Sequence, residues 1–568
     1  MGSTQDPDGL DRRSFLTLAG TAAGAVTAAV AIGGCAPAAG QSAAGRPAMR
    51  PSARSAGTGS GSPGTTPGPR PSPSPAGPPG RADWAALAAR LSTRRLERPG
   101  AAGYGTARLL YDPRFDNAHP AGVAYCAVPA DVSACLAFVR RFGLPVAARS
   151  GGHSYGGWST SPGLVIDVTP MSQVSVDRAA GTARVGAGTL LIDLYAELAG
   201  HGLAVPAGSC PTVGIAGLAL GGGVGVVGRL YGLTCDNIVG VQIVTADGVV
   251  RECGPGSEPD LYWACRGGGG GSFGVVTEFT LRTHPAPDLV IFYLTWPWPQ
   301  AAAVIAAWQR WAPAAPDALW SNLHLAAAPG GQPMISVGGA FAGSQAQVGT
   351  LLAGLYAAAG STPSTVYLQR QSYLDAMRVE AGCASLSVPQ CHLPSQNPDG
   401  VLSREPSYAR SDFYNRPLPA SGIAAMLAEV ERMTSVSGAP GASGGVAFDA
   451  CGGAMNRVSP GATAFVHRSA LFLAQYSIWW TAQSSPGDPA GAGTPGVRRQ
   501  RAWLDGFYAA MRPYASGEAY QNYADPGLAD WERAYYGANY PRLQRVKAAV
   551  DPGDLFRFPQ SVRLPAGS

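Results

Sequence analysis

A glycine-dense segment in the first half of the chain constrains its fold more than any other feature. Residues 205–233 read VPAGSCPTVGIAGLALGGGVGVVGRLYGL. A glycine inside a helix or strand costs roughly 0.5–1 kcal/mol relative to alanine, so an ordinary packed helix is excluded here. Backbone without side chains is useful where a diphosphate must come close, because successive N–H groups can point at its oxygens. The segment therefore predicts a loop that binds a phosphate-bearing cofactor.

A second loop with glycine precedes this segment. Residues 148–159 read ARSGGHSYGGWS. Taken alone, His153 is most simply an ordinary loop histidine, and Cys210 in the later segment is most simply a small buried apolar residue. Their occurrence in this order, with LGGG at residues 220–223 behind the cysteine, favours a joint role in holding one cofactor.

Together the two segments resemble the FAD-binding signatures of the berberine bridge enzyme-like branch of the vanillyl-alcohol-oxidase (PCMH) flavoprotein superfamily. In the bicovalent subgroup that they resemble most, the matching His and Cys both bond to the flavin. The resemblance implies that His153 bonds to the 8α-methyl group of FAD and that Cys210 forms a thioether at C6. It implies a further set of cofactor-binding residues, namely Arg149, Ser150, Gly151, Gly152, Ser154, Tyr155, Gly208, Val213, Gly214, Gly217, Gly221, Gly222 and Asn522.

Later segments resemble the same family. Residues 260–274 read DLYWACRGGGGGSFG, which is similar to its third glycine-rich flavin wall. The segment 473–479 resembles a strand that crosses the substrate face of the flavin. Alternate residues of a strand share a face, so Gln475 and either Tyr476 or Trp479 are candidate substrate contacts. Packing explains these aromatic residues equally well.

The C-terminal segment carries the candidate base. Residues 519–525 read AYQNYAD and match the YxNY pattern of the family. Tyr520 is the first choice for the base and Tyr523 is the alternative, while a phenol that only anchors the chain by a hydrogen bond competes with both. An unperturbed tyrosine has a pKa near 10. The site must therefore stabilise the phenolate or take the proton as hydride leaves.

The resemblance implies that the protein oxidises an alcohol, with a carbohydrate or sugar-bearing metabolite as the expected substrate. Tyr520 would remove the hydroxyl proton while the carbon delivers hydride to the flavin, and dioxygen would then be reduced to hydrogen peroxide. Val213 is small, as in relatives that react with oxygen. Two alternatives stay open. One is a dehydrogenase that uses another electron acceptor, and the other is a non-catalytic surface lipoprotein that retains the fold.

Composition argues against other classes of partner. The formal net charge is +5, but Lys547 is the only lysine and no run of five like charges occurs, so nucleic-acid binding is not expected. No HExxH, CxxC or EF-hand pattern is present, and no metal site is expected.

The N-terminus indicates export. Residues 11–16 read DRRSFL and resemble a twin-arginine signal, and the segment that ends at Cys35 resembles a lipobox. We expect an extracellular or cell-surface protein that touches the membrane only through its signal or a lipid on Cys35. A transmembrane helix is the competing interpretation of the run after the arginines, which is weakly hydrophobic for a span. Export permits disulfides. Cys383 with Cys391 is the best candidate pair, and Cys126 with Cys135 is a weaker one.

The globular part is expected to be mixed α+β. Asp131 is expected to cap a helix that ends at Gly143, and a strand at 144–148 follows. A strand at 164–168, a helix at 190–199 and a hairpin at 238–251 come next. The pattern does not match a nicotinamide-binding Rossmann unit. The expected organisation is a signal with a lipobox at 1–35, a disordered Pro/Ser/Gly/Ala linker at 36–81, a PCMH-type FAD-binding domain at 82–285, a substrate-binding domain whose antiparallel sheet covers the flavin at 286–505, and a C-terminal return to the FAD domain at 506–568.

Overall fold

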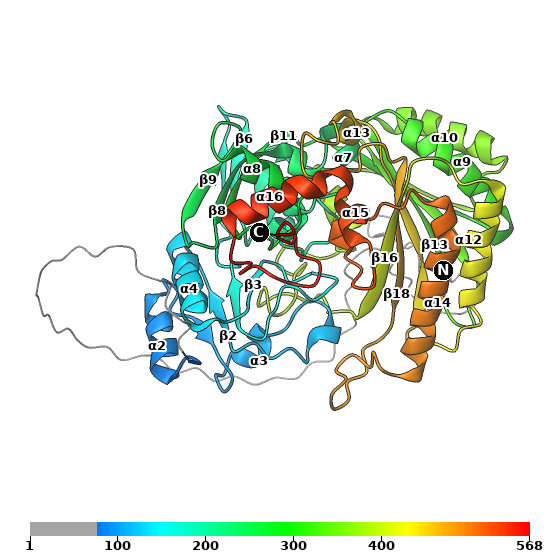
Figure 1. Cartoon of the computed structure of the whole chain (residues 1–568). Coiled ribbons are helices and arrows are strands. Elements are labelled where there is room, and N and C mark those ends of the chain that lie inside the picture. Colours follow the sequence, from blue (N-terminus) through cyan, green and yellow to red (C-terminus); the bar gives the residue numbers. More distant parts are fainter. Residues whose placement is uncertain (1–76, 568) are drawn as a thin grey trace, which may run out of the picture.

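The structure is a computed structural model that describes residues 77–567. The expected signal, Cys35 and nearly all of the expected linker lie outside the described residues. Among residues 77–567, no helix is both long enough and apolar enough to cross a membrane. The described chain forms two halves that lie side by side, and its C-terminal segment returns to the first half (Figure 1). The mixed α+β fold class predicted from the sequence is confirmed.

The first half begins with a small sheet that carries the His153 loop. Its strand order is β1-β2-β4-β3, in which β2, β4 and β3 run parallel and β1 runs antiparallel to β2. The helix α4 packs on this sheet and ends at Gly143, whose φ of 63° lies in the left-handed region that favours glycine. The bounds are β1 (Leu96–Glu97), β2 (Gly122–Tyr125), β3 (Val146–Arg149), β4 (Leu164–Asp167), α2 (Arg81–Arg90), α3 (Tyr104–Ala107) and α4 (Pro129–Phe142).

The start of α4 corrects one expectation. Asp131 is not the residue that precedes the helix, because the helix already begins at Pro129. Proline is tolerated in a first helical turn, where no intrahelical partner for its nitrogen exists. The Asp131 carboxylate instead reaches back from inside the first turn and accepts a hydrogen bond from the Ala127 N–H at 2.9 Å and another from the Ser92 N–H at 2.8 Å. The residue still satisfies N-terminal donors, but from within the helix.

A second, antiparallel sheet completes the first half. Its strand order is β5-β6-β10-β8-β9, and the expected hairpin is formed by β8 and β9. The glycine-dense segment runs past this sheet as loops and short helices rather than as one long helix. The bounds are β5 (Val174–Asp177), β6 (Thr182–Gly186), β8 (Ile238–Val244), β9 (Val250–Cys253), β10 (Val275–Arg282), α5 (Leu191–Gly200), α6 (Ile215–Leu220), α7 (Gly228–Tyr231) and α8 (Pro259–Ala264), with the short pair β7 (Leu203–Ala204) and β11 (His284–Pro285).

The second half is built on a seven-stranded antiparallel sheet with the order β15-β12-β14-β13-β17-β18-β16. Its two faces have different partners because successive side chains of a strand alternate. On β12, Ile291 and Tyr293 join the hydrophobic core of the first half, whereas Phe292 and Leu294 join a separate core beneath helices. The bounds are β12 (Leu289–Trp296), β13 (Leu319–Ala327), β14 (Met334–Phe341), β15 (Thr365–Gln371), β16 (Ser407–Tyr414), β17 (Ser443–Ala450) and β18 (Phe472–Trp479).

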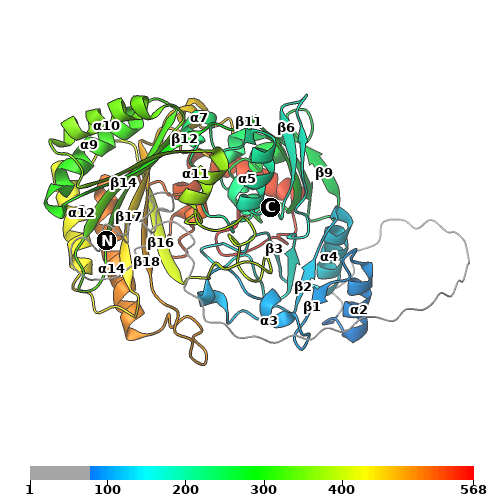
Figure 2. The ribbon, with the colours of Figure 1, turned by 180° about the vertical axis from the view of Figure 1, so that it is seen from behind.

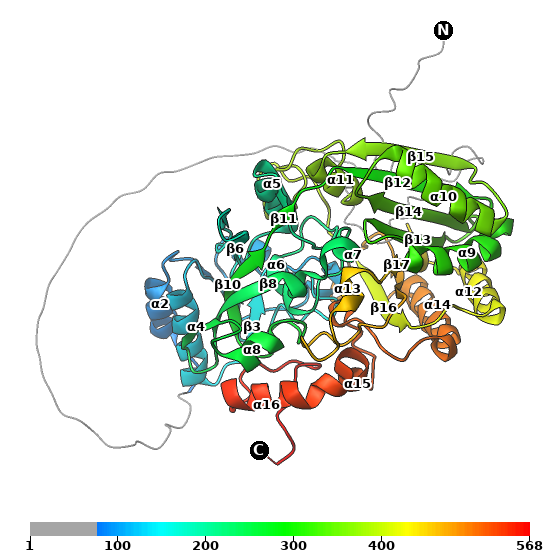
Figure 3. The same cartoon turned by 90° about the horizontal axis from the view of Figure 1, so that it is seen from above.

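Four helices cover the outer face of the large sheet, so its other face is turned toward the first half (Figure 3). They are α9 (Ala301–Ala314), α10 (Gln345–Ala359), α12 (Ala420–Met433) and α14 (Pro495–Met511). Two elements link the halves: α11 (Tyr373–Glu380) lies beside α5 (Figure 2), and α13 (Ala454–Arg457) lies beside α7. The chain closes on the first half with α15 (Trp531–Tyr536) and α16 (Tyr540–Val550). Short 3-10 helices are η2 (Pro113–Phe115), η3 (Thr234–Asn237), η4 (Trp298–Gln300), η5 (Arg512–Tyr514), η6 (Gln521–Tyr523) and η7 (Gly537–Asn539).

Candidate active site

A cavity of about 550 Å³ is lined by residues from both halves. The first half supplies the His153 loop, the 208–226 segment and the third glycine-rich loop, which includes residues 269–271. The large sheet supplies residues of β13, β17 and β18, and the C-terminal segment supplies residues 520–524 and 556–560. Segments that are far apart in the sequence therefore meet around one space.

The two glycine-rich signatures pack directly on each other. A Cβ atom added to Gly151 would lie 2.2 Å from the Gly214 nitrogen, and one added to Gly214 would lie 2.0 Å from the Ser150 hydroxyl oxygen. No side chain fits at either position. The Ser150 hydroxyl donates to the Ala187 carbonyl at 2.7 Å, which fixes the start of the His153 loop.

His153 and Cys210 meet at one threonine. The Nε2 atom of His153 lies 2.9 Å from the Thr212 hydroxyl oxygen, and the Cys210 sulfur lies 3.8 Å from the same oxygen. The His153 ring stacks on Tyr111 with centroids 4.0 Å apart. Burial lowers the pKa of His153 to about 3, so its imidazole is neutral at physiological pH. The structure therefore brings the two candidate attachment residues together on the cavity wall. The Cys210 sulfur is disulfide-bonded in this structure, so a thioether could form only on its reduced form.

The cavity has the features that a flavin nucleotide requires. Gly217 and Gly270 line it, and a Cβ added to either would have no neighbour closer than 3.8 Å, so an aromatic ring or a phosphate can approach the bare backbone. Gln521 and Gln560 also line it, and the Oε1 atom of each is buried without a hydrogen-bond partner among residues 77–567. Such orphaned acceptors are rare in folded proteins and suit the ring N–H or hydroxyl groups of a bound molecule. The residues present therefore fit FAD.

Two of the expected cofactor residues, Gly221 and Gly222, do not line the cavity, whereas Arg149 does. The Arg149 guanidinium donates to the Ala107 carbonyl at 2.7 Å and pairs with Asp167 at 3.3 Å, so its charge is held by the protein itself. Gly221 and Gly222 do not line the cavity but lie behind its wall. A Cβ on Gly221 would lie 1.9 Å from the Asn522 side chain, so this glycine makes room for Asn522 rather than for a cofactor. The other expected residues all line the cavity, namely Arg149, Ser150, Gly151, Gly152, His153, Ser154, Tyr155, Gly208, Cys210, Val213, Gly214, Gly217 and Asn522.

The large sheet forms a polar wall of the cavity. Asn322 of β13 lies opposite Asp449 of β17. On the neighbouring positions, His324, Ala447 and Gln475 lie side by side across β13, β17 and β18. The Gln475 amide donates to the Tyr155 hydroxyl at 2.8 Å. Side chains opposite each other on neighbouring strands are close enough to act together on one ligand. The small side chain of Ala447 separates the two polar members of its row. Two tryptophans, Trp320 and Trp479, also line this wall.

The prediction that Tyr476 could contact the substrate is wrong. It lies on the opposite face of β18 from Gln475 and Trp479, where it is fully buried. Its hydroxyl lies 2.6 Å from that of Tyr414, and its ring packs on Phe507 of α14. A side chain held beneath the outer helices cannot touch a substrate in the cavity.

The two candidate bases have different environments. The Tyr520 oxygen accepts hydrogen bonds from the Gly223 N–H at 2.8 Å, the Val224 N–H at 3.3 Å and the Asn522 side chain at 2.9 Å. Burial raises the pKa of Tyr520, while these donors lower it. Tyr523 makes no hydrogen bond through its hydroxyl within residues 77–567, and its ring stacks on Tyr155 with centroids 5.6 Å apart. Burial and then the negative charge of Asp449 raise the pKa of Tyr523 well above its usual range.

Sequence reasoning missed much of the substrate-facing wall. Trp320, Asn322 and His324 occupy alternate positions of β13, and Asp449 lies on β17. The alternation of polar and apolar residues in WSNLHL is a signal that could have indicated a strand with one polar face. Nothing in the sequence indicates that this face meets the His153 loop.

Comparisons with known proteins agree with this site. A family model described as FAD binding domain matches residues 120–254, and one described as Berberine and berberine like matches residues 519–563. The uncharacterized FAD-linked oxidoreductase YgaK of Bacillus subtilis is 32% identical over 452 residues, which cover 78% of this chain and 91% of that protein.

Solved structures share the fold. Physcomitrella patens BBE-like 1 is 32% identical with a TM-score of 0.73, over 83% of this chain and 97% of that one. The xylooligosaccharide oxidase of Myceliophthora thermophila C1, solved in complex with xylobiose, is 25% identical with a TM-score of 0.73, over 85% of this chain and 99% of that one. Fold, cavity and matches together define an FAD-linked oxidoreductase. The chain belongs to the berberine bridge enzyme-like family.

Proposed function

We propose that this protein is an FAD-dependent oxidase of an alcohol group on a carbohydrate or sugar-bearing metabolite, with the flavin attached to both His153 and Cys210. One observation carries the proposal: the Thr212 hydroxyl contacts both attachment residues on the wall of a cavity whose facing wall is polar. A neutral imidazole is the nucleophilic form of histidine, which suits bond formation by His153.

The residues of the polar wall support a polyhydroxylated substrate. Asn322, Asp449 and Gln475 offer amide and carboxylate groups for hydroxyl hydrogen bonds, and the Trp320 and Trp479 rings offer apolar surface for the face of a sugar ring. The related xylooligosaccharide oxidase, solved in complex with xylobiose, fits the same substrate class. Among the described residues of the large sheet that line this wall, Asp449 is the one carboxylate and no lysine or arginine occurs, so we propose neutral rather than anionic sugars.

We assign the base to Tyr523 in preference to Tyr520. A neutral phenol oxygen has two lone pairs, and the Tyr520 oxygen already accepts three hydrogen bonds from the chain. It has no direction left for a substrate hydroxyl. The Tyr523 hydroxyl is free of such bonds within residues 77–567 and lines the cavity near Gln475. When bound, the flavin supplies the hydride acceptor and passes the electrons to dioxygen as hydrogen peroxide.

We also propose that the protein is exported through its twin-arginine signal, with or without lipid on Cys35. The Cys383–Cys391 disulfide supports this, because disulfides persist in oxidising compartments.

The test is the absorbance of acid-precipitated protein. We expect the flavin to stay with the pellet of the parent and of the single variants His153→Ala and Cys210→Ser, and to wash out of the double variant. Turnover of neutral oligosaccharides with release of hydrogen peroxide tests the reaction. Flavin that leaves the parent pellet would contradict the covalent attachment, and a parent whose colour no sugar bleaches would contradict the substrate class.

A further inference from the structure

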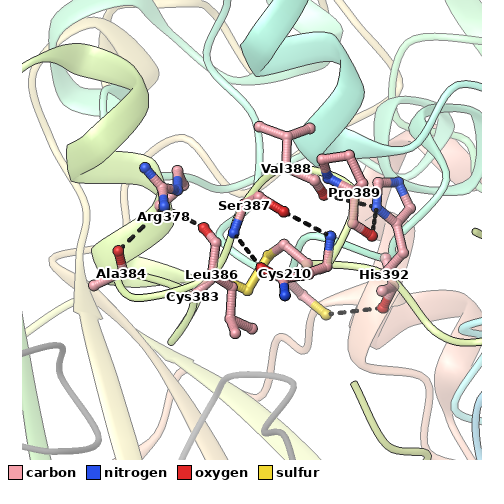
Figure 4. The surroundings of a disulfide bond; sticks show 12 residues. Cys210, Arg378, Cys383, Ala384, Leu386, Ser387, Val388, Pro389 and His392 are labelled. Atoms are coloured by element: carbon pink, nitrogen blue, oxygen red, sulfur yellow. Dashed lines mark hydrogen bonds between the residues drawn. A yellow bond between two sulfur atoms is a disulfide. The ribbon is translucent and has the colours of Figure 1, made fainter. Parts of the chain in front are cut away.

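A long connection between the halves lies beside the proposed attachment site. Residues 381–406 join α11 to β16, and we name this segment the strap. Cys383 and Cys391 form a disulfide within it with an S–S distance of 1.97 Å, and both residues are fully buried. The pair proposed from the sequence is therefore confirmed, whereas Cys126 and Cys135 are free thiols with sulfurs 3.9 Å apart. Cys210 lies among the residues that surround the disulfide (Figure 4).

The strap holds the backbone of the Cys210 segment. The Gln396 amide donates to the Thr212 carbonyl at 3.3 Å, and its oxygen accepts from the Leu393 N–H at 3.2 Å. Thr212 is the residue whose hydroxyl contacts both His153 and Cys210. One side chain of the strap thus fixes the peptide that separates Cys210 from Val213.

Other contacts anchor the strap to the first half on both sides of Gln396. His392 pairs with Asp193 of α5 at 3.2 Å. The Arg404 Nε atom donates to the Leu110 carbonyl at 2.7 Å, and its guanidinium pairs with Asp116. Leu110 precedes Tyr111, the residue that stacks on His153. The strap therefore contacts the surroundings of both attachment residues.

The disulfide and a small apolar cluster hold the strap in place on both sides of Gln396. It closes a loop with a sequence separation of 8, which removes conformational freedom from the chain around it. The apolar side chains of Ile192, Leu393 and Leu402 pack with the two cysteines in one small cluster. A segment held in this way can keep Gln396 at a fixed position against Thr212.

We propose that the strap is a positioning element for flavin attachment at Cys210. By holding the Thr212 peptide, the strap keeps the Cys210 sulfur close to the edge of the flavin ring to which His153 is attached. The proposal rests on the proposed function. The attachment starts from the reduced form of Cys210, before its sulfur enters a disulfide. A sulfur–carbon bond then forms, the S–H and the ring C–H bonds are lost, and the two electrons and two protons pass to dioxygen, which leaves as hydrogen peroxide. Gln396 is a positioning residue in this reaction and touches none of the reacting atoms.

The test compares three variants of the full chain expressed with FAD. Gln396→Ala removes the contact with Thr212. The double variant Cys383→Ser/Cys391→Ser removes the disulfide. Gln390→Ala is the matched control, because this glutamine is on the same strap and, among the described residues, its side-chain oxygen accepts from the nearby Ser387 N–H rather than from the Cys210 segment. After acid precipitation and digestion, mass spectrometry measures the fraction of Cys210 peptide and of His153 peptide that carries flavin, and thermal unfolding checks the fold.

Loss of a net hydrogen bond of ordinary strength reduces the correctly positioned population about fivefold. For Gln396→Ala we expect a fall of about this size in Cys210-linked flavin at a fixed exposure time, with His153-linked flavin and the unfolding midpoint at parental values. The control should match the parent. If the Cys383→Ser/Cys391→Ser variant does not fold, the level of Cys210-linked flavin in Gln396→Ala alone tests the role of the strap. Parental levels of Cys210-linked flavin in Gln396→Ala would overturn the role of the strap while leaving the proposed function intact. A parent without flavin on either residue would overturn the covalent attachment and the strap proposal together.

Discussion

At the scale of single residues, hydrogen bonding separates two tyrosines that the sequence could not. Both belong to the pattern at residues 519–525, and both line the cavity. The chain itself surrounds the Tyr520 oxygen with three N–H donors, whereas the Tyr523 hydroxyl makes no hydrogen bond to residues 77–567. A group that must take a proton from a substrate needs an unoccupied lone pair, and Tyr523 lines the cavity without a donor to its hydroxyl among the described residues.

Tyr523→Phe should lower kcat by about 10²–10⁴-fold with little change in flavin attachment, because a positioned base contributes an effect of that size. Stopped-flow reduction of the flavin by the sugar measures this step directly. Asn522→Leu is the accompanying variant. It removes a donor that lowers the pKa of Tyr520, so it raises that pKa and would move the pH profile upward if Tyr520 were the base. We expect the position of the profile to follow Tyr523 instead. An alkaline shift in Asn522→Leu together with an active Tyr523→Phe would reverse the assignment.

Val213 allows a test of whether the reduced enzyme reacts with dioxygen. It lines the cavity three residues after Cys210. Val213→Leu adds a methylene at this wall and should slow reoxidation of the reduced enzyme by air, with flavin reduction by substrate unchanged. Anaerobic reduction followed by mixing with aerated buffer measures both steps. Reoxidation at the parental rate would favour a dehydrogenase with another acceptor.

At the scale of elements, the alternation of β13, β17 and β18 creates the polar wall. The sequence predicted that alternate residues near position 475 share a face, but it could not say whether Tyr476 or Trp479 joins Gln475. The outer helices decide this, because Phe507 of α14 covers the face that carries Tyr476. Trp320 lies on the cavity face of β13, and its indole Nε1 atom is buried without a partner among the described residues.

Trp320→Phe tests this wall. It removes an N–H donor and keeps an aromatic ring, so it should raise KM about fivefold through the loss of one hydrogen bond, with kcat near the parental value. Steady-state kinetics with a neutral oligosaccharide measures the two constants separately. Trp311→Phe is the matched control, because its Nε1 atom donates to the Leu351 carbonyl at 3.0 Å on the outer helices. An unchanged KM in Trp320→Phe would remove this residue from the substrate site.

At the scale of the whole molecule, one buried lysine binds the C-terminal segment to the third glycine-rich loop. The Lys547 ammonium donates to the Ser272 carbonyl at 3.0 Å and to the Phe556 carbonyl at 2.7 Å, and it pairs with Asp551 at 2.6 Å. Both members of the pair are fully buried. The only lysine of the chain is thus a structural cation and not part of a basic surface.

Lys547→Met should lower the free energy of unfolding by about 3–5 kcal/mol, because it leaves the buried Asp551 carboxylate, and the Asp554 carboxylate 3.3 Å from the ammonium, without their counter-charge. Denaturant unfolding measures the change. The double variant Lys547→Met/Asp551→Asn should recover part of the loss, since the fully buried Asp551 charge is then gone. A double variant less stable than the single one would contradict this explanation.

The sequence by itself determined the cofactor class, the His153 and Cys210 loops, the mixed fold and the Cys383–Cys391 pair. These features are local, because glycine density, short motifs and strand periodicity are properties of neighbouring residues. Tertiary structure alone decided which tyrosine hydroxyl is free, which face of β18 meets the cavity, and that Gln396 holds Thr212 across 184 positions of the chain. Such contacts depend on how separate elements pack, and no local pattern encodes the packing of one half of the molecule on the other.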